Sequence, residues 1–390
     1  MKILYLADIR FPMERANGIQ TVETAHALAR RGVEVDLVVR RTDGQSDEAC
    51  LEFFGLAPHP GLRLRRVSAP FGKWSYLAAA LGLLARAGGR WDFVYTRDLV
   101  LADLALRLGT LPLIYEAHTL AAVFAEEHGR LYGAERAPSK AKLSRLDKRE
   151  RRVCCGAAGV VTITRALEKA LEERHGKIAP FRVVPDGTRL PEGLPAFEGL
   201  HSPPSVYYIG QLYPWKGVDV LVEAMRHVNG AELVIVGGLP PEPDLDRLRS
   251  LASRLSLEDR VRFRGFVPPP ELPAERANAD LFVIPLLDST TARLFTSPLK
   301  LFEAMASGRP VVASDLPSMR EILIHEENAL LVPPGDARAL AAAIERLLRD
   351  RDLSRRLAAR AFEDVKAYSW DRRAEAISTF LGSLTGDSRG

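Results

Sequence analysis

The feature that most constrains the fold is a regular alternation of short apolar segments with longer amphipathic ones, which runs twice along the 390 residues. Near the start, the apolar runs KILYLAD and VEVDLVV flank the amphipathic segment IQTVETAHALARRG, which ends at a glycine. Short apolar runs bounded by turn residues predict buried strands, and an apolar period of 3.6 residues predicts a helix. Strands that alternate with helices predict an α/β fold with parallel, doubly wound sheets.

Later apolar runs extend the same pattern through both halves of the chain. They are WDFVYTR, LPLIYEAH, GVVTIT and FRVVPDG in the first half, and SVYYIG, ELVIVGG, VRFRGFV, DLFVIPL and RPVVASD in the second. The segment between them is rich in proline and glycine and has little periodicity, which is typical of a linker. Because the chain is too long for one core, we expect two Rossmann-like domains, residues 1–187 and 205–367, joined by a linker at 188–204. We expect the C-terminal helix, 368–390, to join the first domain.

The composition is that of an ordinary globular protein, with 47% hydrophobic and 27% charged residues. The first apolar run soon meets Asp8, so it resembles a strand rather than a signal peptide, and no apolar stretch is long enough to span a bilayer. Three cysteines give neither a disulfide framework nor the spacing of metal ligands. We therefore expect a cytoplasmic protein without a metal site, and any contact with the membrane is expected to be peripheral, on its inner face.

The net charge of +4 conceals a difference between the halves. Residues 1–190 carry 30 basic and 22 acidic residues, a net charge of +8, whereas the remainder carries 24 and 28, a net charge of −4. The densest basic segment, Arg130 to Arg152, has nine basic and three acidic residues. It is either a solvated helix face or a surface for an anionic membrane or acidic acceptor. Nucleic acid is not expected as a partner, because aromatic residues are not interleaved with the charges.

Two loops that follow predicted strands carry residues suited to binding an anion. Asn17 and Gly18 lie just before a predicted helix, where free N–H groups can hold a phosphate that approaches the glycine closely. Lys216 precedes Gly217 and another helix, so its ammonium group would stand beside a positive helix end. The alternatives are a purely structural Asn-Gly turn and an ordinary surface lysine.

A third candidate lies in the segment SPLKLFEAMASGRPVVASD, where Glu303 is predicted in the first turns of a helix. A carboxylate at such a place needs hydrogen-bond donors, and the paired hydroxyl groups of a ribose would satisfy it. The alternative is a surface glutamate in a salt bridge.

The order and spacing of several segments give the chain a family resemblance. YIGQLYPWKGVDVLVEAM, VIVGG, SPLKLFEAMASGRPVVASDLPSMREIL and VPPGDARALAAAIERLL resemble the C-terminal domain of family 4 (group 1) retaining glycosyltransferases with the GT-B fold. NGIQTVETAHALARRGVEVDLVV, VYTR, YEAH and VVPDGTRL resemble their N-terminal domain. The resemblance implies an acceptor-binding first domain, a donor-binding second domain, and a cleft between two facing sheets.

The resemblance also implies roles for individual residues. Lys216 matches the lysine that contacts the donor diphosphate, and Glu303 matches the second glutamate of a pair, which holds the ribose hydroxyls. Asn17 and Gly18 match the loop that closes over the phosphates, and His118 matches a histidine near the transferred sugar. Taken alone, a single histidine after a strand is more often structural.

The chain departs from the family pattern at two positions. Phe295 stands where the first glutamate of the pair is expected, and Gln211 stands where an arginine is usual. We expect the phosphate charge to be met instead by Arg293, Lys300 and main-chain N–H groups from Ser297 to Leu299. The predicted catalytic residues are His118 and Lys216, and the predicted donor-binding residues are Asn17, Gly18, Gly210, Gln211, Lys216, Arg293, Ser297, Pro298, Leu299, Lys300 and Glu303.

The function predicted from the sequence is transfer of a sugar from a nucleotide-sugar donor to an acceptor, with retention of configuration and without a metal or other cofactor. The acceptor is not identified and is expected to be a glycan, a small molecule or a lipid-linked or otherwise anionic compound. Asp244 and Asp246 form an Asp-x-Asp sequence, but it lies in a polar connection before a helix, where we do not expect metal binding. Two rival functions remain open: a nucleotide-sugar epimerase or hydrolase of the same fold, and a non-catalytic sugar-nucleotide-binding protein.

Overall fold

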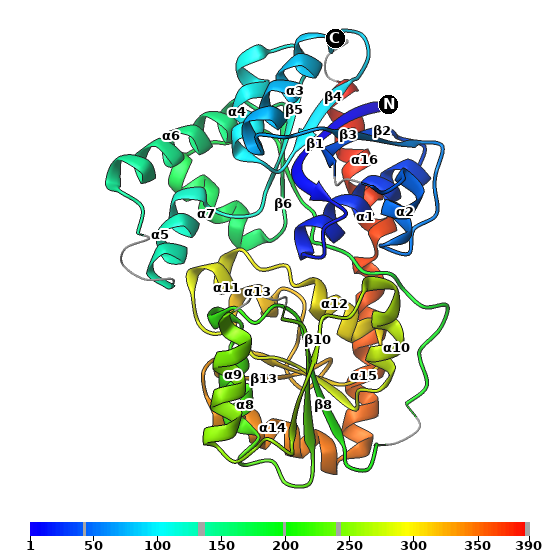
Figure 1. Cartoon of the computed structure of the whole chain (residues 1–390), viewed down its shortest axis with the longest axis vertical. Coiled ribbons are helices and arrows are strands. Elements are labelled where there is room, and N and C mark those ends of the chain that lie inside the picture. Colours follow the sequence, from blue (N-terminus) through cyan, green and yellow to red (C-terminus); the bar gives the residue numbers. More distant parts are fainter. Residues whose placement is uncertain (42–43, 132–136, 198–199, 239–242, 387–390) are drawn as a thin grey trace. The chain divides into compact units, whose positions relative to one another are not determined.

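The computed structural model describes residues 1–41, 44–131, 137–197, 200–238 and 243–386 (Figure 1). The chain divides into two compact units, Met1–Gly187 together with Trp370–Gly390, and Thr188–Ser369. The first unit therefore takes its last helix from the C-terminal end of the chain. The proline-rich segment at 188–204 belongs to the second unit.

The first unit is built on a parallel sheet of seven strands in the order β3-β2-β1-β4-β5-β6-β7. The strands are β1 (Lys2–Phe11), β2 (Glu34–Arg41), β3 (Leu62–Val67), β4 (Phe93–Thr96), β5 (Leu113–Ala117), β6 (Gly159–Thr162) and β7 (Phe181–Val183). Strand β3 was not predicted from the sequence, because LRLRRV alternates leucine with arginine instead of forming an apolar run. An edge strand with one exposed face can fold with apolar residues on its other face alone.

Helices cover both faces of this sheet, as a doubly wound fold requires (Figure 1). On one face lie α3 (Lys73–Ala85), α4 (Leu99–Leu108) and α6 (Lys140–Gly156), each packed on the next. On the other face α1 (Ala16–Arg30) packs against α16 (Trp370–Gly386). The remaining helices are α2 (Asp47–Glu52), α5 (Ala121–Leu131) and α7 (Arg165–His175).

The second unit has a parallel sheet of six strands in the order β10-β9-β8-β11-β12-β13. They are β8 (Ser205–Ile209), β9 (Glu232–Val236), β10 (Val261–Gly265), β11 (Leu281–Ile284), β12 (Val311–Ser314) and β13 (Leu330–Val332). Strand β13 was not predicted, because three residues are too few for a periodic pattern. The two sheets establish the predicted architecture of two parallel α/β units.

Alternate residues of the central strands of the second unit face two apolar clusters. Val206 and Tyr208 point to the side of α8 (Val218–Ala224), α9 (Pro243–Arg254) and α14 (Ala337–Arg349). Tyr207 and Ile209 point to the side of α10 (Leu272–Ala277), α12 (Leu299–Ala306) and α15 (Arg351–Val365). Short helices complete the unit: α11 (Thr290–Leu294), α13 (Pro317–Arg320) and the 3₁₀ turns η2 (Pro214–Lys216), η3 (Pro269–Glu271) and η4 (Lys366–Tyr368).

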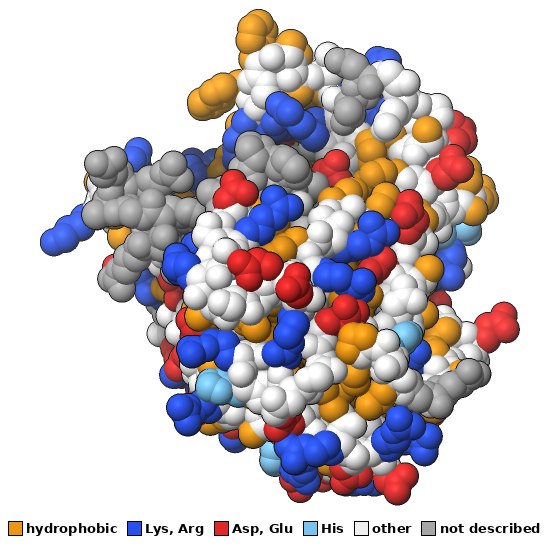
Figure 2. Space-filling view, turned by 60° about the horizontal axis from the view of Figure 1, so that its bottom comes forward, with side chains coloured by type: hydrophobic (Ala, Val, Ile, Leu, Met, Phe, Trp, Pro, Cys, Tyr) orange, Lys and Arg blue, Asp and Glu red, His pale blue; other side chains and the backbone are white. Residues whose placement is uncertain are grey.

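The surface mixes the two signs of charge. On the face drawn in Figure 2, Lys and Arg side chains are interspersed with Asp and Glu. Ion pairs near the surface, such as that of Arg360 with Asp364, bring opposite charges together. Within the described ranges, no helix is both long enough and apolar enough to cross a membrane.

Candidate functional site

Each sheet has one point where its strand order reverses, and the predicted site residues follow the strands at these points. In the first unit the chain continues from β1 to β2 on one side, while β4 lies on the other; in the second unit β8 lies between β9 and β11. In open parallel sheets, ligands bind beyond the carboxyl ends of the strands at such switch points. Asn17 and Gly18 follow β1, and Lys216 follows β8.

The loop after β1 differs in detail from the prediction, because α1 begins at Ala16 and already includes Asn17 and Gly18. The Gly18 N–H is not free, since it donates to the carbonyl of Arg15 at 2.8 Å. A Cβ at position 18 would lie 2.5 Å from the Met13 carbonyl oxygen, so close packing within the chain already requires glycine here. The start of α1 has neither a side-chain cap nor an acidic residue in its first turn, which leaves its positive end uncompensated.

His118, just after β5, takes part in a buried polar network. Its Nε2 lies 2.7 Å from Oε1 of Glu116, whose side chain is completely buried. Burial and the charge of Arg97 lower the pKa of His118 and outweigh the opposing effect of Glu116, so the ring is neutral near pH 7. His118 is thus a neutral, hydrogen-bonded imidazole at the carboxyl edge of the sheet.

Three further partners of Glu116 come from three other elements. Its carboxylate accepts hydrogen bonds from Gln20 of α1 at 2.7 Å, from Arg373 of α16 at 2.5 Å, and from the hydroxyl of Tyr95 in β4. Burial raises the pKa of Glu116, but the charge of Arg373, the hydrogen bond from His118 and the charge of Arg97 outweigh it and hold the pKa well below its usual range. Glu116 is therefore an ionised carboxylate in the interior of the unit.

Lys216 lies in a tightly fixed loop between the ends of β8 and β11. Gly217 has a positive φ of 66°, and a Cβ there would lie 1.9 Å from the Pro285 carbonyl oxygen, so only glycine fits. The Leu287 N–H donates to the Trp215 carbonyl at 3.0 Å, which ties the same loop to the segment after β11. The lysine is thus held beside the switch point of the second sheet.

The Lys216 ammonium group has no carboxylate partner among the described residues. Burial lowers its pKa to about 8, which means that the protein removes water from the charge without supplying an opposite one. An anion bound there would restore the balance. Gly210 and Gln211 lead into this loop, and the Gln211 carbonyl accepts a hydrogen bond from Tyr208 at 2.6 Å.

Glu303 lies in α12 and is held by two cations. Its Oε2 accepts from Arg276 Nη1 at 2.9 Å and from Lys300 Nζ at 3.0 Å, whereas Oε1 has no partner within the described part of the chain. Burial raises the pKa of Glu303, but Lys300 and Arg276 outweigh it, so the net shift is downward. The carboxylate stays ionised and keeps one oxygen available for donors.

The other predicted donor-binding residues are placed as follows. The helix α12 begins at Leu299 after Pro298, has no side-chain cap, and is preceded by the buried Ser297. Lys300 is engaged with Glu303, and Arg293 is exposed and forms a bidentate pair with Asp288. Both cations therefore already have carboxylate partners.

Two residues, Phe295 and Gln211, depart from the family pattern, and both are at least partly buried. Phe295 is buried at the end of α11, with 5% of its surface exposed, and Gln211 is half-buried. A buried phenyl ring offers no hydrogen-bond acceptor for a sugar hydroxyl, so position 295 contributes packing.

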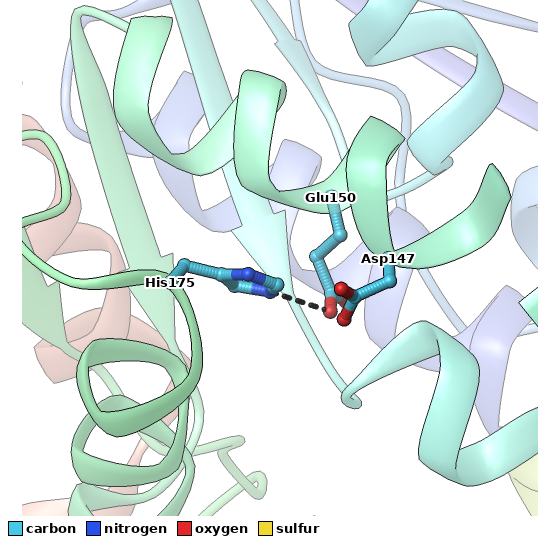
Figure 3. Close-up of side chains that lie close together, drawn as sticks. All are labelled: Asp147, Glu150 and His175. Carbon is cyan, nitrogen blue, oxygen red and sulfur yellow. Dashed lines mark hydrogen bonds and ion pairs between the residues drawn. The ribbon is translucent and has the colours of Figure 1, made fainter. Parts of the chain in front are cut away.

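Three groups with metal-ligating chemistry come together away from the switch points. Asp147 and Glu150 of α6 and His175 at the end of α7 place their ligand atoms within 4.8 Å of one another (Figure 3). His175 Nε2 lies 3.0 Å from Oε2 of Glu150, and the Ala121 N–H donates to Oε1 at 2.7 Å, so both oxygens are occupied. Asp147 pairs with Arg174. We therefore interpret this cluster as a structural tie between α5, α6 and α7.

The Asp-x-Asp sequence lies in the first turn of α9. Asp244 pairs with Arg247 at 3.1 Å, and Asp246 lies 3.9 Å from Arg249. Both carboxylates thus have partners three residues later on their own helix, and they also suit the positive end of that helix.

Several residues of these networks had no signal in the sequence. Glu116 lies two residues before His118, but its partners Tyr95 and Arg373 are far away in the chain. Arg276, which holds Glu303, lies in the short helix α10 and belongs to none of the recognised segments. The indication that the sequence offered was Glu116 itself, because a carboxylate in a predicted buried strand needs hydrogen-bond donors around it.

Two family models match the chain. The model described as "Glycosyl transferase 4-like domain" matches residues 17–187, and the model described as "Glycosyl transferases group 1" matches residues 203–350. The two matches fall in the first and second halves of the chain, respectively, and together they cover both sheets except for β1.

Two relatives are named as glycosyltransferases, one matching nearly the whole chain and the other about half of it. The D-inositol 3-phosphate glycosyltransferase of Corynebacterium efficiens is 26% identical over 94% of this chain and 90% of that protein. The GDP-mannose-dependent alpha-(1-6)-phosphatidylinositol monomannoside mannosyltransferase of Mycobacterium tuberculosis is 37% identical over 46% of this chain and 47% of its own length.

Solved structures show the same fold. The sucrose-phosphate synthase of Thermosynechococcus elongatus superimposes with a TM-score of 0.81 at 24% identity, covering 99% of this chain and 100% of that one. Anabaena HepE in complex with UDP-glucose gives a TM-score of 0.73 at 22% identity, covering 98% and 100%. The two-unit architecture is therefore the GT-B fold.

Proposed function

Because this chain belongs to the group 1 glycosyltransferases and is a nucleotide-sugar-dependent enzyme, we propose that it transfers its sugar with retention of configuration and without a metal ion. The leaving group in such a transfer is a nucleoside diphosphate. The main catalytic demand is therefore stabilisation of the negative charge that develops on the β-phosphate. Metal-independent enzymes must meet this demand with protein cations and N–H groups.

The observation that carries the proposal is the uncompensated charge of Lys216. Its ammonium group is partly removed from water, has no carboxylate partner among the described residues, and lies at the switch point of the second sheet. The uncapped start of α12 supplies N–H groups that have no acceptor within the helix. We assign the diphosphate to these groups, and we assign the ribose to the unpartnered Oε1 of Glu303.

The anomeric configuration is retained if the acceptor attacks the anomeric carbon from the same face from which the leaving group departs. The bond between the anomeric carbon and the phosphate oxygen breaks, the bond to the acceptor oxygen forms, and the acceptor proton passes to the departing phosphate. This course needs no protein nucleophile. It requires only that the charge on the phosphate be stabilised and that water be excluded.

Two measurements test this proposal. The anomeric configuration of the first product is read by NMR before it can equilibrate, and retention is expected. Activity should also survive excess EDTA, because protein groups replace the metal. An inverted product would refute the stereochemical part, and loss of activity in EDTA that Mn²⁺ or Mg²⁺ restores would refute the metal-free part.

The acceptor proposed here carries an anionic group. The first 190 residues have a net charge of +8, which attracts an acidic acceptor in a salt-dependent way. Phosphorylated inositol is a reasonable first choice, given the name of the Corynebacterium relative. With UDP-glucose and GDP-mannose as first donors, D-inositol 3-phosphate should be used in preference to free inositol, and its KM should rise with salt. Equal use of both acceptors at all salt concentrations would contradict this choice.

A peripheral membrane contact is proposed for the face formed by α3, α4 and α6. Phe71 and Trp74 are 82% and 78% exposed, and Leu81, on the same side of α3 as Trp74, is 42% exposed. On α6, the exposed Lys140 and Lys148 have no ion pair among the described residues. Exposed aromatic side chains and cations on helices that cover the same face of the sheet suit an anionic lipid surface. Residues 132–136 of the predicted basic segment lie outside the described residues.

Co-sedimentation with lipid vesicles tests this contact. The parent chain should bind vesicles with anionic lipid, and the double variant Phe71→Ser, Trp74→Ser should bind them less. A variant with Lys140, Lys148 and Arg151 changed to Gln should lose the preference for anionic vesicles. Arg149 and Arg152 are left in place because they pair with Asp103 of α4. Absence of binding, or equal binding to neutral vesicles, would refute the contact.

A further inference from the structure

Among the described residues, one nitrogen of the His118 ring has a hydrogen-bond partner and the other has none. Nε2 lies 2.7 Å from Glu116 Oε1, and Nδ1 has no partner within the described part of the chain. The side chain is 14% exposed, so a ligand can reach it. The chemistry that His118 offers to a ligand therefore depends on which nitrogen carries the proton.

Glu116 decides this question because it can only accept hydrogen bonds. Its carboxylate receives donors from Gln20, Tyr95 and Arg373, as described above, in addition to His118. The Gln20 amide cannot turn round, since its Oε1 accepts from Arg97 Nη1 at 2.9 Å. A carboxylate surrounded by a guanidinium group and other donors stays ionised and has no proton to give.

Arg373 is itself fixed in place by the backbone of the first unit. Its Nη1 donates to the carbonyls of Val184 at 2.7 Å and Pro185 at 2.9 Å, and its Nε donates to Thr24 Oγ1 at 3.0 Å. The guanidinium plane is thus set by contacts with β7's end and α1, and Nη2 is directed at Glu116. The C-terminal helix thereby determines the position of a carboxylate in β5.

We propose that Glu116, held by Arg373 and Tyr95, is a positioning residue that fixes His118 as the Nε2–H tautomer and presents Nδ1 as an acceptor for a substrate hydroxyl group. The proposal rests on the proposed function, since the hydroxyl group that His118 would bind belongs to a substrate of the proposed transfer. A neutral imidazole protonated at Nε2 carries a lone pair on Nδ1. His118 then selects a hydroxyl of a sugar or acceptor and does not serve as a donor to phosphate oxygens.

The tautomer can be observed directly in the intact protein. The chain is labelled with ¹⁵N-histidine, and long-range proton–nitrogen correlation spectra at pH 7.5 report which nitrogen of each ring is protonated. The His118→Asn variant identifies the signals of His118. Protonation at Nε2 alone is expected, and protonation at Nδ1, or at both nitrogens, would overturn the proposal. This result does not depend on sugar transfer.

A matched pair of variants tests the functional part. The amide oxygen of Asn can take the place of Nδ1, whereas Gln reaches only the place of Nε2. If a substrate hydroxyl needs an acceptor at Nδ1, His118→Asn should stay close to the parent kcat/KM, and His118→Gln should fall about 10- to 100-fold, the range expected when a buried hydroxyl is left without its acceptor. Equal activity of the two variants would overturn the proposal.

The positioning role has its own measurement. Glu116→Gln should produce a mixture of His118 tautomers in the spectra and lower kcat/KM, while the affinity for the bare nucleoside diphosphate stays unchanged. A single Nε2–H tautomer in this variant would remove Glu116 from the proposal. If this variant does not fold, the Asn and Gln variants of His118 still decide the issue. If the parent transfers no sugar at all, the proposed function fails while the spectra still test the tautomer.

Discussion

Arg373 donates a hydrogen bond of 2.5 Å to the carboxylate of Glu116, a residue that lies 257 positions earlier in the chain, and both side chains are buried. The pair joins the last helix of the chain to the centre of the first sheet. Each charge is the closest opposite charge of the other, because Arg373 lies farther from Asp186, at 3.8 Å, and loss of either one would leave the other buried with weaker compensation.

Removal of one partner should therefore destabilise the first unit strongly. Arg373→Met is expected to cost about 3–5 kcal/mol of unfolding free energy, measured by urea denaturation. The control is Arg372→Met, because Arg372 is the neighbour of Arg373 on the same helix but pairs with Glu375 at the surface. Its cost should be about 0–1 kcal/mol. The double variant Glu116→Leu, Arg373→Met should recover part of the loss, and similar costs for the two single arginine variants would contradict the assignment.

The same pair predicts how stability depends on acid. Because its neighbours lower the pKa of Glu116 below the ordinary value of 4.5, its ionised form stabilises the folded state at all pH values above that. The contribution should be lost as the pH falls below 4.5, since protons then bind the unfolded chain first. Urea denaturation of the parent and of the double variant between pH 3 and pH 7 measures this, and the parent should show the steeper decline.

The sequence predicted most of the strands and the loop residues that follow them, because each of these depends on neighbours within a few positions; it did not predict β3, β13 or the strand orders. Lys216 and Glu303 were proposed as site residues in this way. The partners of the buried charges could not be found, because the fold brings Arg373 to Glu116 and Arg276 to Glu303 from distant segments. The loop at Gly18 was also predicted only in part. The sequence indicated where the loop lies, but not that the Gly18 N–H donates a hydrogen bond to the Arg15 carbonyl.

Lys216 should contribute directly to donor affinity. A charged hydrogen bond to phosphate is worth about 1.5–3 kcal/mol, so Lys216→Ala should weaken binding of nucleoside diphosphates about 10- to 100-fold in calorimetry. Lys169→Ala is the control, because Lys169 is 79% exposed on α7. If Lys216→Ala binds every nucleoside diphosphate as tightly as the parent does, the diphosphate lies elsewhere.

The affinity for nucleoside diphosphate should also depend on pH. The pKa of Lys216 is lowered to about 8 in the ligand-free protein, so above pH 8 a growing fraction of the protein has a neutral amine that must take up a proton before it binds phosphate. Affinity should fall by up to about tenfold per pH unit above pH 8. Lys216→Arg should remove this dependence, because a guanidinium group stays charged. Identical pH profiles for the parent and this variant would exclude Lys216 as the titrating group.

Glu303 should distinguish the ribose from the phosphates. Its Oε2 is occupied by Arg276 and Lys300, so Oε1 is the oxygen left to accept from the ribose hydroxyls. Glu303→Gln keeps the shape but replaces a charged acceptor, and we expect affinity for nucleoside diphosphate to fall about tenfold or more. Inorganic pyrophosphate has no ribose, so its affinity should not fall in the same variant.

Titration of the parent with 2′-deoxy and 3′-deoxy nucleoside diphosphates shows which hydroxyl is bound, since the analogue lacking that hydroxyl should lose affinity in the parent but not in the variant. Equal losses for pyrophosphate and nucleoside diphosphate would mean that Glu303 acts through Lys300 on the phosphates instead.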